Sequence, residues 1–371
     1  MRYKLNIAAF AVVCAAFALL VIAFPRDLRT IERENRNFNL LEITVENVFG
    51  GGFDRDVEAY VSDRVGYRAD FVTLAARLRE LSGLPAADHA KIVGSVLSAD
   101  DGLAEIFAFD GAAAADYAAA LNAYRAELGE NVRVFSLIAP TRIEFMEPKY
   151  SRISDSELDA IRAVNAGLSD GITPVDAYSA LAEHSDEYIY FRTDHHWTAR
   201  GAYYAYRAFA DAAGFVPLGL DDYSVGRLDG FLGYLYNFAP SAAVASSPDY
   251  IEYFTCNGAL TTSPELLKLP AAGEKTEYRV FLGGDYDELT IETSVKNGKT
   301  AVVIKDSYAN CLVPWLAPHY ERLVLLDPRS FEGSALEKIR EYGDADIDLL
   351  FVNYVFSTSF ADFAQLIDEM R

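Results

Sequence analysis

The sequence predicts an α/β fold in which a parallel sheet is flanked by helices. Apolar runs near the C-terminus, at residues 301–304, 323–327 and 347–355, alternate with helical patterns. Such alternation is typical of parallel sheets. Residues 132–138 form a further, mostly apolar run that predicts another strand. Functional side chains in such sheets lie at the carboxyl ends of the strands, so the residues directly after these runs are the first candidates for a site.

The other elements are expected where apolar residues recur at regular spacing between start and stop signals. Asp110 is the predicted N-cap of an alanine-rich helix that stops at Gly129, and the run Ser154-Asp155-Ser156-Glu157 predicts a capping box. The expected segments, in chain order, are helices at 54–62 and 69–81, short strands within 91–109 around a turn at 100–102, a helix at 112–128, a helix from the capping box to 168, a strand at 175–178, and helices at 198–213, 308–316 and 334–342.

Residues 217–300 depart from this regular pattern. They are rich in Gly, Tyr, Ser and Asp and contain few periodic runs, which predicts a loop-and-hairpin insertion that forms a wall of a substrate cleft. The expected organisation is therefore a signal anchor at 1–25, a membrane-proximal helical stalk at 26–90, and a catalytic domain at 91–371 that contains this insertion.

Composition and charge exclude several classes of function. A chain of 371 residues with 51% hydrophobic and 13% aromatic residues is globular rather than disordered. The net charge of −22 argues against a nucleic-acid partner, because phosphate binding needs clustered Lys and Arg, and it disfavours peripheral docking on anionic lipid. No GxGxxG, P-loop, HExxH, EF-hand or GxSxG pattern occurs, so we expect no cofactor.

The N-terminus predicts a membrane anchor. Arg2 and Lys4 precede an apolar stretch at 5–24 that Pro25 closes. About 20 apolar residues span the hydrocarbon core of a bilayer, and positive charges before the span keep that end in the cytoplasm. The alternative is a cleaved signal peptide, but the small-residue pattern at 9–11 lies too early for cleavage. We expect a single-pass protein of the cell membrane with its catalytic domain outside the cytoplasm.

The richest concentration of titratable side chains lies in the run Asp194-His195-His196-Trp197. It holds two of the five histidines and one of the two tryptophans of the chain, directly before the helix expected at 198–213. In an extended chain, residues two apart point to the same side. This spacing predicts that Asp194 and His196 lie together and that His195 points away.

A serine at a strand end supplies the matching nucleophile. Ser307 follows the apolar run at 301–304, where a helical pattern begins. A serine hydroxyl needs a base to take its proton, and a histidine backed by an acid can do so. We therefore predict Ser307 as nucleophile, His196 as base and Asp194 as the orienting acid. The Ser307 N–H, with Asn310 as a weaker candidate, would stabilise the oxyanion.

Other interpretations of the same residues remain open. Asp306 and Ser307 could simply cap a helix, and the acid–histidine run could be a polar loop before one. Asp194, His195 and His196 could instead bind a metal ion. Trp197 could be a core residue or a platform on which a sugar stacks.

Cysteine usage sets few limits on the fold. Cys14 lies in the expected anchor, which leaves Cys256 and Cys311 outside it. These two could form one disulfide or remain unpaired, and no zinc-type spacing is present.

The run Arg-Thr-Asp-His-His-Trp-Thr, at 192–198, resembles the signature of the bacterial DHHW proteins. That family is similar to the SGNH-hydrolase-like alginate O-acetyltransferase proteins of the periplasm. Other segments agree in order and spacing, so the resemblance covers nearly the whole ectodomain. They are Glu34-Asn35-Arg36, residues 63–68, residues 304–310, residues 314–320 and Asp327-Pro328-Arg329.

The resemblance implies an SGNH-like α/β domain with a Ser–His–Asp triad. The Asp-x-His of the alginate-type relatives maps onto Asp194 and His196, and their later serine maps onto Ser307. In ordinary SGNH hydrolases the serine comes first, so the order here looks like a circular permutation. Arg192, His195 and Trp197 lie in the same motif and are weaker candidates for oxyanion or substrate contacts.

The resemblance also implies a function and a partner. We expect an extracytoplasmic O-acetyltransferase that moves an acetyl group through acyl-Ser307 onto a hydroxyl of an exopolysaccharide or cell-wall glycan. A multipass membrane-bound O-acyltransferase would bring the acetyl group across the bilayer. The alternatives are a carbohydrate acetylesterase, in which water reaches the acyl-enzyme, and a non-catalytic glycan-binding or scaffold protein of an acetylation complex.

Overall fold

The computed structural model describes residues 91–93, 95–99, 102–148, 150, 153–240, 242–343 and 346–371. The anchor expected at 1–25, the stalk at 26–90 and the two helices within that stalk lie outside these residues. Within the described part of the chain, no helix is long and apolar enough to cross a membrane. The chain divides into one unit made of 1–88 and 236–246 and another made of 89–235 and 247–371. The second unit carries the fold described here.

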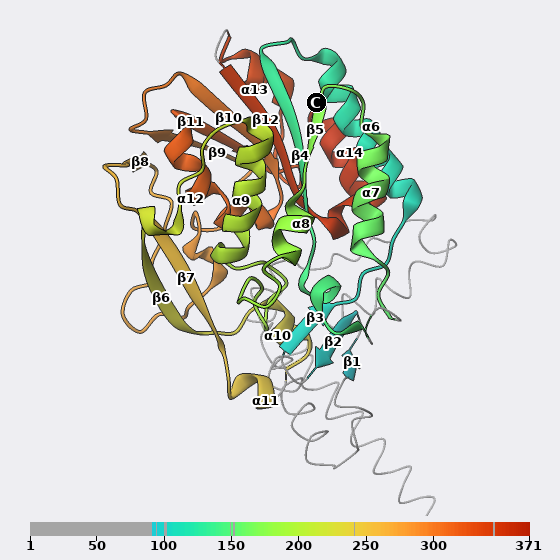
Figure 1. Ribbon diagram of the computed structural model, residues 1–371, viewed down its shortest axis with the longest axis vertical. Coiled ribbons are helices and arrows are strands. Elements are labelled where there is room, and N and C mark those ends of the chain that lie inside the picture. The colour runs from blue at the N-terminus through green and yellow to red at the C-terminus, as the bar shows by residue number, and fades with distance from the viewer. Residues whose placement is uncertain are drawn as a thin grey trace, which may run out of the picture. The chain divides into compact units, whose positions relative to one another are not determined.

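A seven-stranded sheet forms the centre of this unit, with the strand order β5-β4-β12-β10-β11-β9-β8 (Figure 1). Five neighbouring strands are parallel, as the alternating apolar runs predict. They are β5 (Ile172–Val175), β4 (Val132–Ala139), β12 (Asp346–Tyr354), β10 (Lys299–Lys305) and β11 (Arg322–Leu326). Two antiparallel strands extend the predicted parallel sheet at one edge: β9 (Glu288–Thr293) runs antiparallel to β11, and β8 (Thr262–Ser263) runs antiparallel to β9.

Helices cover both faces of the sheet, and the strands supply apolar side chains to both. In β10, Ala301 and Val303 join the cluster on one face, and Val302 and Ile304 join the cluster on the other. This alternation explains why the strand is a continuous apolar run. The first face is covered by α8 (Ala177–Ala182), α9 (Ala199–Ala213) and α12 (Val313–Leu316), and the second by α6 (Gly111–Glu127), α7 (Glu157–Gly167), α13 (Ala335–Arg340) and α14 (Ala361–Glu369).

Capping residues define the ends of the longer helices. Asp110 caps α6 by accepting hydrogen bonds from the N–H groups of residues 112 and 113, as predicted. Thr198 caps α9, and Gly214 ends it with a φ of 73° in the left-handed region. The predicted capping box at Ser154 is wrong, because Ser156 caps α7 and Ser154 accepts from the N–H of Phe107.

Two other predicted elements differ from the structure. The strand expected at 175–178 is β5, which ends at Val175, because Asp176 caps α8 directly after it. The single helix expected at 308–316 is a 3₁₀ turn at Ser307–Cys311, followed by α12 and a second 3₁₀ turn at Ala317–His319. Pro314 has no N–H to donate, and it fits only where a helix begins anew, in the first turn of α12.

The smaller sheets match the expected hairpins. β1 (Lys91–Val93), β2 (Val96–Ala99) and β3 (Gly102–Glu105) form an antiparallel sheet, as the short strands expected within 91–109 predict. Within 217–300, β6 (Tyr223–Phe231) and β7 (Asp249–Cys256) form a hairpin, whereas β8 and β9 extend the central sheet. The short helices α10 (Tyr234–Phe238) and α11 (Ala242–Ala245) lie between the hairpin strands in sequence.

Candidate active site

The residues around Asp194 form a tight hairpin-like loop rather than an extended strand. Tyr190 and Trp197 pair across the loop, and the N–H of Phe191 donates to the carbonyl of His196 at 3.3 Å. The chain bends at each residue from 192 to 196. His195 therefore does not point away, as the extended spacing predicts: its ring centroid lies 4.0 Å from that of His196.

The loop brings the three predicted catalytic side chains into one hydrogen-bonded line. His196 Nδ1 lies 2.6 Å from Asp194 Oδ1, and His196 Nε2 lies 2.8 Å from Ser307 Oγ. Asp194 and His196 are buried. A carboxylate cannot donate, so Nδ1 carries the proton toward Asp194 and leaves Nε2 free to accept from the serine hydroxyl. This is the geometry that a serine needs to become a nucleophile.

The two histidines and neighbouring backbone N–H groups hold Asp194 in its ionised form. Its Oδ1 accepts from the N–H of His196 at 3.0 Å, and its Oδ2 accepts from the N–H of Tyr234 at 2.7 Å. Burial opposes ionisation, but the charges of His196 and His195, the hydrogen bond with the His196 side chain and the one from the Tyr234 N–H lower the pKa of Asp194 overall. The close approach requires Gly233, because a Cβ there would lie 2.2 Å from the Cβ of Asp194.

Asp249 on β7 anchors the start of the loop and was not predicted from the sequence. Its Oδ2 accepts from the N–H groups of Arg192 and Thr193, at 2.9 and 2.7 Å, and from the Thr193 hydroxyl at 2.6 Å. Its Oδ1 accepts from Tyr188 at 2.8 Å and from Arg192 Nε at 3.1 Å. Asp249 lies more than fifty positions from the motif, so no local spacing could reveal it.

Tyr278 was also missed, and it covers the face of the histidine. Its ring stacks on that of His196 with centroids 3.8 Å apart and planes inclined by 9°. Its hydroxyl donates to the carbonyl of Ser307 at 3.1 Å, so one side chain contacts both the base and the nucleophile's backbone. It is one of 23 tyrosines, and nothing in its local sequence distinguishes it.

The nucleophile is fixed by the turn that follows β10. Asp306 Oδ1 accepts from the N–H of Tyr308 at 2.9 Å, and its Oδ2 accepts from the N–H of Tyr354 at 2.9 Å. The capping interpretation of Asp306 is therefore correct, and it leaves Ser307 free to face His196. The indole of Trp197 donates to the carbonyl of Tyr308 at 2.8 Å, which ties the two motifs together.

The weaker candidates have mostly structural positions. The Asn310 amide donates to Asp285 at 2.9 Å and accepts from the buried Lys305 at 2.8 Å, which fixes it between two charged side chains, and its role as an oxyanion donor stays a prediction. Arg192 pairs with Asp249. Trp197 is fully buried, so the platform for a sugar is wrong and the core interpretation is correct.

The same cluster has the donor atoms of a possible metal site. Ligand atoms of Asp194, His195 and His196 lie within 4.8 Å of one another. Both ring nitrogens of His196 are engaged, one by Asp194 and one by Ser307, so a metal ion there would have to break the hydrogen-bonded line. The donor set therefore fits a proton relay better than a metal centre.

The two described cysteines are both free, and the disulfide considered for Cys256 and Cys311 is not formed. Burial raises the pKa of the Cys311 thiol to about 12. The thiol therefore stays protonated and is no rival to Ser307 as nucleophile.

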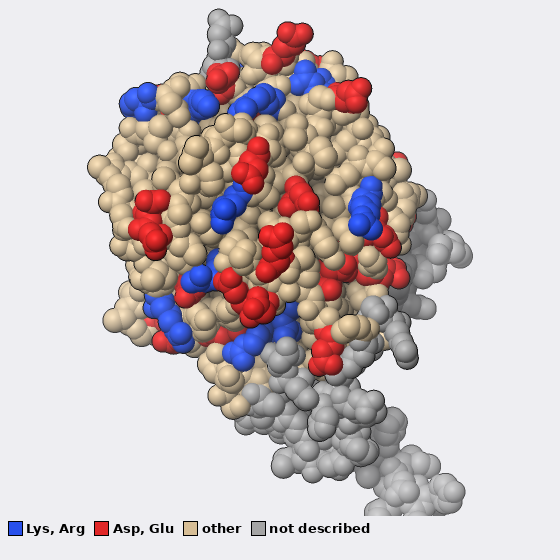
Figure 2. All heavy atoms as spheres, viewed as in Figure 1, with Lys and Arg blue, Asp and Glu red and all other residues tan. Residues whose placement is uncertain are grey.

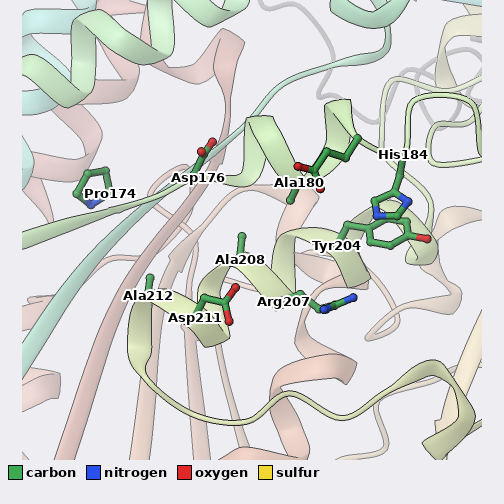
Figure 3. Close-up of a pocket in the computed structure, with 10 residues that line it drawn as sticks. Pro174, Asp176, Ala180, His184, Tyr204, Arg207, Ala208, Asp211 and Ala212 are labelled. Atoms are coloured by element: carbon green, nitrogen blue, oxygen red, sulfur yellow. The ribbon is translucent and has the colours of Figure 1, made fainter.

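A cavity of about 440 Å³ opens between α8 and α9 (Figure 3). Its charged lining comes from Arg207 and Asp211 on α9 and from the two residues that cap α8, Asp176 and Glu183, and the ring of His184 lies flat against that of Tyr204. Asp194, His196 and Ser307 do not line this cavity, so the cavity is separate from the candidate active site.

Comparisons with known proteins place the chain in a family. The sequence profile of the DHHW proteins matches residues 83–326. A crystal structure of a DHHW family protein from Eubacterium siraeum is 30% identical, covers 75% of this chain and 96% of that one, and gives a TM-score of 0.67. The chain belongs to the DHHW family.

A more distant structure shares the fold. PatB1 of Bacillus cereus is 21% identical and covers 74% of this chain and 98% of that one, with a TM-score of 0.59. The O-acetyltransferase domain of Pseudomonas putida AlgJ is 13% identical and covers 76% and 99% of the two chains, with a TM-score of 0.41. No curated protein matches the sequence.

Proposed function

We propose that the chain is a serine-dependent O-acetyltransferase that transfers an acetyl group through acyl-Ser307. The observation that supports this most strongly is the line of Asp194, His196 and Ser307, with distances of 2.6 and 2.8 Å, at the carboxyl end of a central parallel strand. Sites in this class of sheet lie at that edge.

In the first half-reaction, Ser307 Oγ attacks the carbonyl carbon of the acetyl donor. His196 Nε2 takes the hydroxyl proton, and Asp194 stabilises the resulting imidazolium. The tetrahedral intermediate then collapses, and the leaving group departs with the proton that His196 returns. Ser307 opens a 3₁₀ turn, where N–H groups have no partner within the helix, so its own N–H is the first candidate for the oxyanion.

The proposed acceptor is a hydroxyl of an exopolysaccharide or cell-wall glycan outside the cytoplasm. The apolar stretch at 5–24 would anchor the chain in the cell membrane with its C-terminal part outside. There a multipass membrane-bound O-acyltransferase would supply the acetyl group. The resemblance of the sequence motifs to the alginate-type O-acetyltransferase proteins supports both the glycan acceptor and the membrane-bound partner.

The test uses the full-length chain and para-nitrophenyl acetate, with and without a panel of oligosaccharides. We expect Ser307→Ala to lower nitrophenol release by about a thousandfold, and the wild type to place acetyl groups on a saccharide. Release that depends on Ser307 but yields only free acetate would identify an acetylesterase. Equal release from wild type and Ser307→Ala would contradict the proposed nucleophile and would favour a non-catalytic glycan-binding or scaffold function.

A further inference from the structure

Two polar atoms near the catalytic line are buried without a hydrogen-bond partner. Among the described residues, they are Nδ1 of His195 and Oε2 of Glu105. Buried polar atoms in native proteins are nearly always paired, so each exception needs an explanation. A binding site for a hydroxyl-bearing ligand would explain both atoms, because a hydroxyl can donate a hydrogen bond to a carboxylate and can also accept one.

The two residues come from separate elements that are joined beside the site. Glu105 ends β3, and β3 is attached to the catalytic loop through the N–H of Leu103, which donates to the carbonyl of Arg192 at 2.6 Å. Gly102 permits this contact, since a Cβ there would lie 2.6 Å from the Cβ of Arg192. The small sheet is thus held against the loop that carries His195.

Electrostatics agree that the two groups face a common environment. Burial raises the pKa of Glu105, and the charge of His195 acts in the opposite direction. Burial, followed by the charge of His196, lowers the pKa of His195, which favours a neutral imidazole. A neutral imidazole and a carboxyl group are both suited to hydrogen bonds with sugar hydroxyls.

Aromatic side chains surround His195 on several sides. Its ring lies 5.2 Å from Tyr234 in an edge-on arrangement, and 6.1 Å from Tyr354. Binding sites for small polar molecules commonly combine such aromatic walls with a few converging polar groups. The cluster of Glu105, His195, Tyr234 and Tyr354 has this composition, and it adjoins the base of the proposed reaction.

We propose that Glu105 and His195 bind hydroxyls of the acceptor sugar and direct a neighbouring hydroxyl toward acetyl-Ser307. This inference rests on the proposed function. The sugar oxygen attacks the ester carbonyl while His196 takes its proton. The bond between the acetyl carbon and Ser307 Oγ then breaks, and His196 returns the proton to Oγ. The products are an acetylated sugar and free serine, with no further reactant.

The experiment measures how acetyl-Ser307 partitions between sugar and water. The full-length chain is given para-nitrophenyl acetate with glycerol, cellopentaose or chitopentaose, and acetylated product and free acetate are quantified together. Glu105→Leu removes the carboxyl at similar size, and His195→Phe keeps a ring against His196 but removes its nitrogens. Glu105→Gln tests rescue by an uncharged hydrogen-bonding group. Glu130→Leu, at an exposed site before β4, is the matched control.

We expect the ratio of acetylated pentasaccharide to acetate to fall about tenfold in Glu105→Leu and in His195→Phe, to recover in part in Glu105→Gln, and to stay at the wild-type value in Glu130→Leu. Acetate from spontaneous hydrolysis is measured with Ser307→Ala and subtracted. A partly unfolded variant then does not disturb the ratio, because both remaining products come from active molecules only. An unchanged ratio in both variants would overturn the inference. The inference would also be overturned if the wild type acetylated no saccharide while nitrophenol release still depended on Ser307. That outcome would not contradict the proposed acyl-Ser307 intermediate.

Discussion

At the scale of single residues, the candidate site depends on how His196 is enclosed. Asp194 lies behind its Nδ1, Ser307 lies before its Nε2, and Tyr278 covers its ring. The first two contacts fix the tautomer and the direction of proton transfer. The third places an aromatic face where positive charge develops during the reaction, and such a contact is stabilising when it is shielded from water.

Tyr278 therefore offers a test that separates its ring from its hydroxyl. We expect Tyr278→Leu to lower kcat for para-nitrophenyl acetate about tenfold with little change in KM, because the ring acts on the imidazolium and not on the bound ester. Tyr278→Phe keeps the ring and should retain kcat within about threefold of the wild type. Equal losses in the two variants, or a loss confined to KM, would show that the stacked ring has no role in the transition state.

Some residues of the candidate site can be predicted from a local sequence motif, and others cannot. Asp194, His196 and Ser307 could be predicted because a compact motif and a strand end each concentrate chemistry locally. Asp249 and Tyr278 could not be predicted, because each lies far from the motif in the sequence, in a segment without a recognisable pattern, and contacts it only in the folded chain. The direction of His195 was wrong because local hydrogen bonds bend the loop instead of extending it.

At the scale of elements, α9 determines where the catalytic loop ends. The hydroxyl of Thr198 accepts from the N–H of Gly201 at 3.2 Å and donates to the carbonyl of Tyr188 at 2.8 Å, so the cap joins both sides of the hairpin-like loop. Gly201 lets the helix approach the loop, since a Cβ there would lie 2.4 Å from the carbonyl oxygen of Ile189.

The helix–loop contact can be tested by overpacking it. We expect Gly201→Ala to lower the free energy of unfolding by about 1–3 kcal/mol, because the backbone carbonyl of Ile189 cannot move without shifting the loop. Gly111→Ala, in which the new Cβ lies 3.7 Å from Phe109 in ordinary contact, should be neutral or slightly stabilising. Chemical denaturation of both variants measures this difference, and equal midpoints would contradict the proposed contact.

The elements that the sequence predicted well are those with strong periodicity and clear caps. α6, α9 and the parallel strands match their expected positions within a few residues. The segment at 217–300 is harder to predict, because β9 joins the sheet by pairing with β11 and the two-residue edge strand β8 by pairing with β9, and neither pairing can be read from the segment's own composition. The broken helix after Ser307 follows from Pro314, which is a local signal in the sequence for the start of a new helix.

At the scale of the whole molecule, the net charge of −22 is the dominant electrostatic feature. Figure 2 shows acidic and basic side chains interspersed over the face in view. Several acidic groups nevertheless lie inside the protein. Glu157 is fully buried, and it accepts hydrogen bonds from the N–H and the hydroxyl of Thr141 at 2.5 and 2.6 Å. Burial is the main cause that raises the pKa of Glu157 to about 8.

The raised pKa of Glu157 predicts a pH dependence of stability. The folded state binds this proton more tightly than the unfolded chain, whose carboxyl has an ordinary pKa of 4.5. The contribution is therefore fully present below pH 4.5 and is lost as the pH rises through 8. When the pH is raised from 5 to 8, we expect the wild type to lose about 3 kcal/mol more of its unfolding free energy than Glu157→Gln loses.

Denaturation curves at several pH values provide the measurement. Gln is a suitable probe because its amide oxygen can accept from the Thr141 N–H while its amide nitrogen donates to the Thr141 hydroxyl oxygen. If wild type and Glu157→Gln lose stability in parallel over this range, Glu157 is not the group responsible.

The central claim is that Ser307 carries the acetyl group, and trapping that intermediate tests it most directly. The full-length chain is mixed with para-nitrophenyl acetate, quenched in acid within the first turnover, digested and analysed by mass spectrometry. The account predicts one added acetyl group on the peptide that contains Ser307, and no stable acetylation of that peptide in Ser307→Ala. An acetyl group on another side chain that turns over at the rate of nitrophenol release, with Ser307 unmodified, would contradict it.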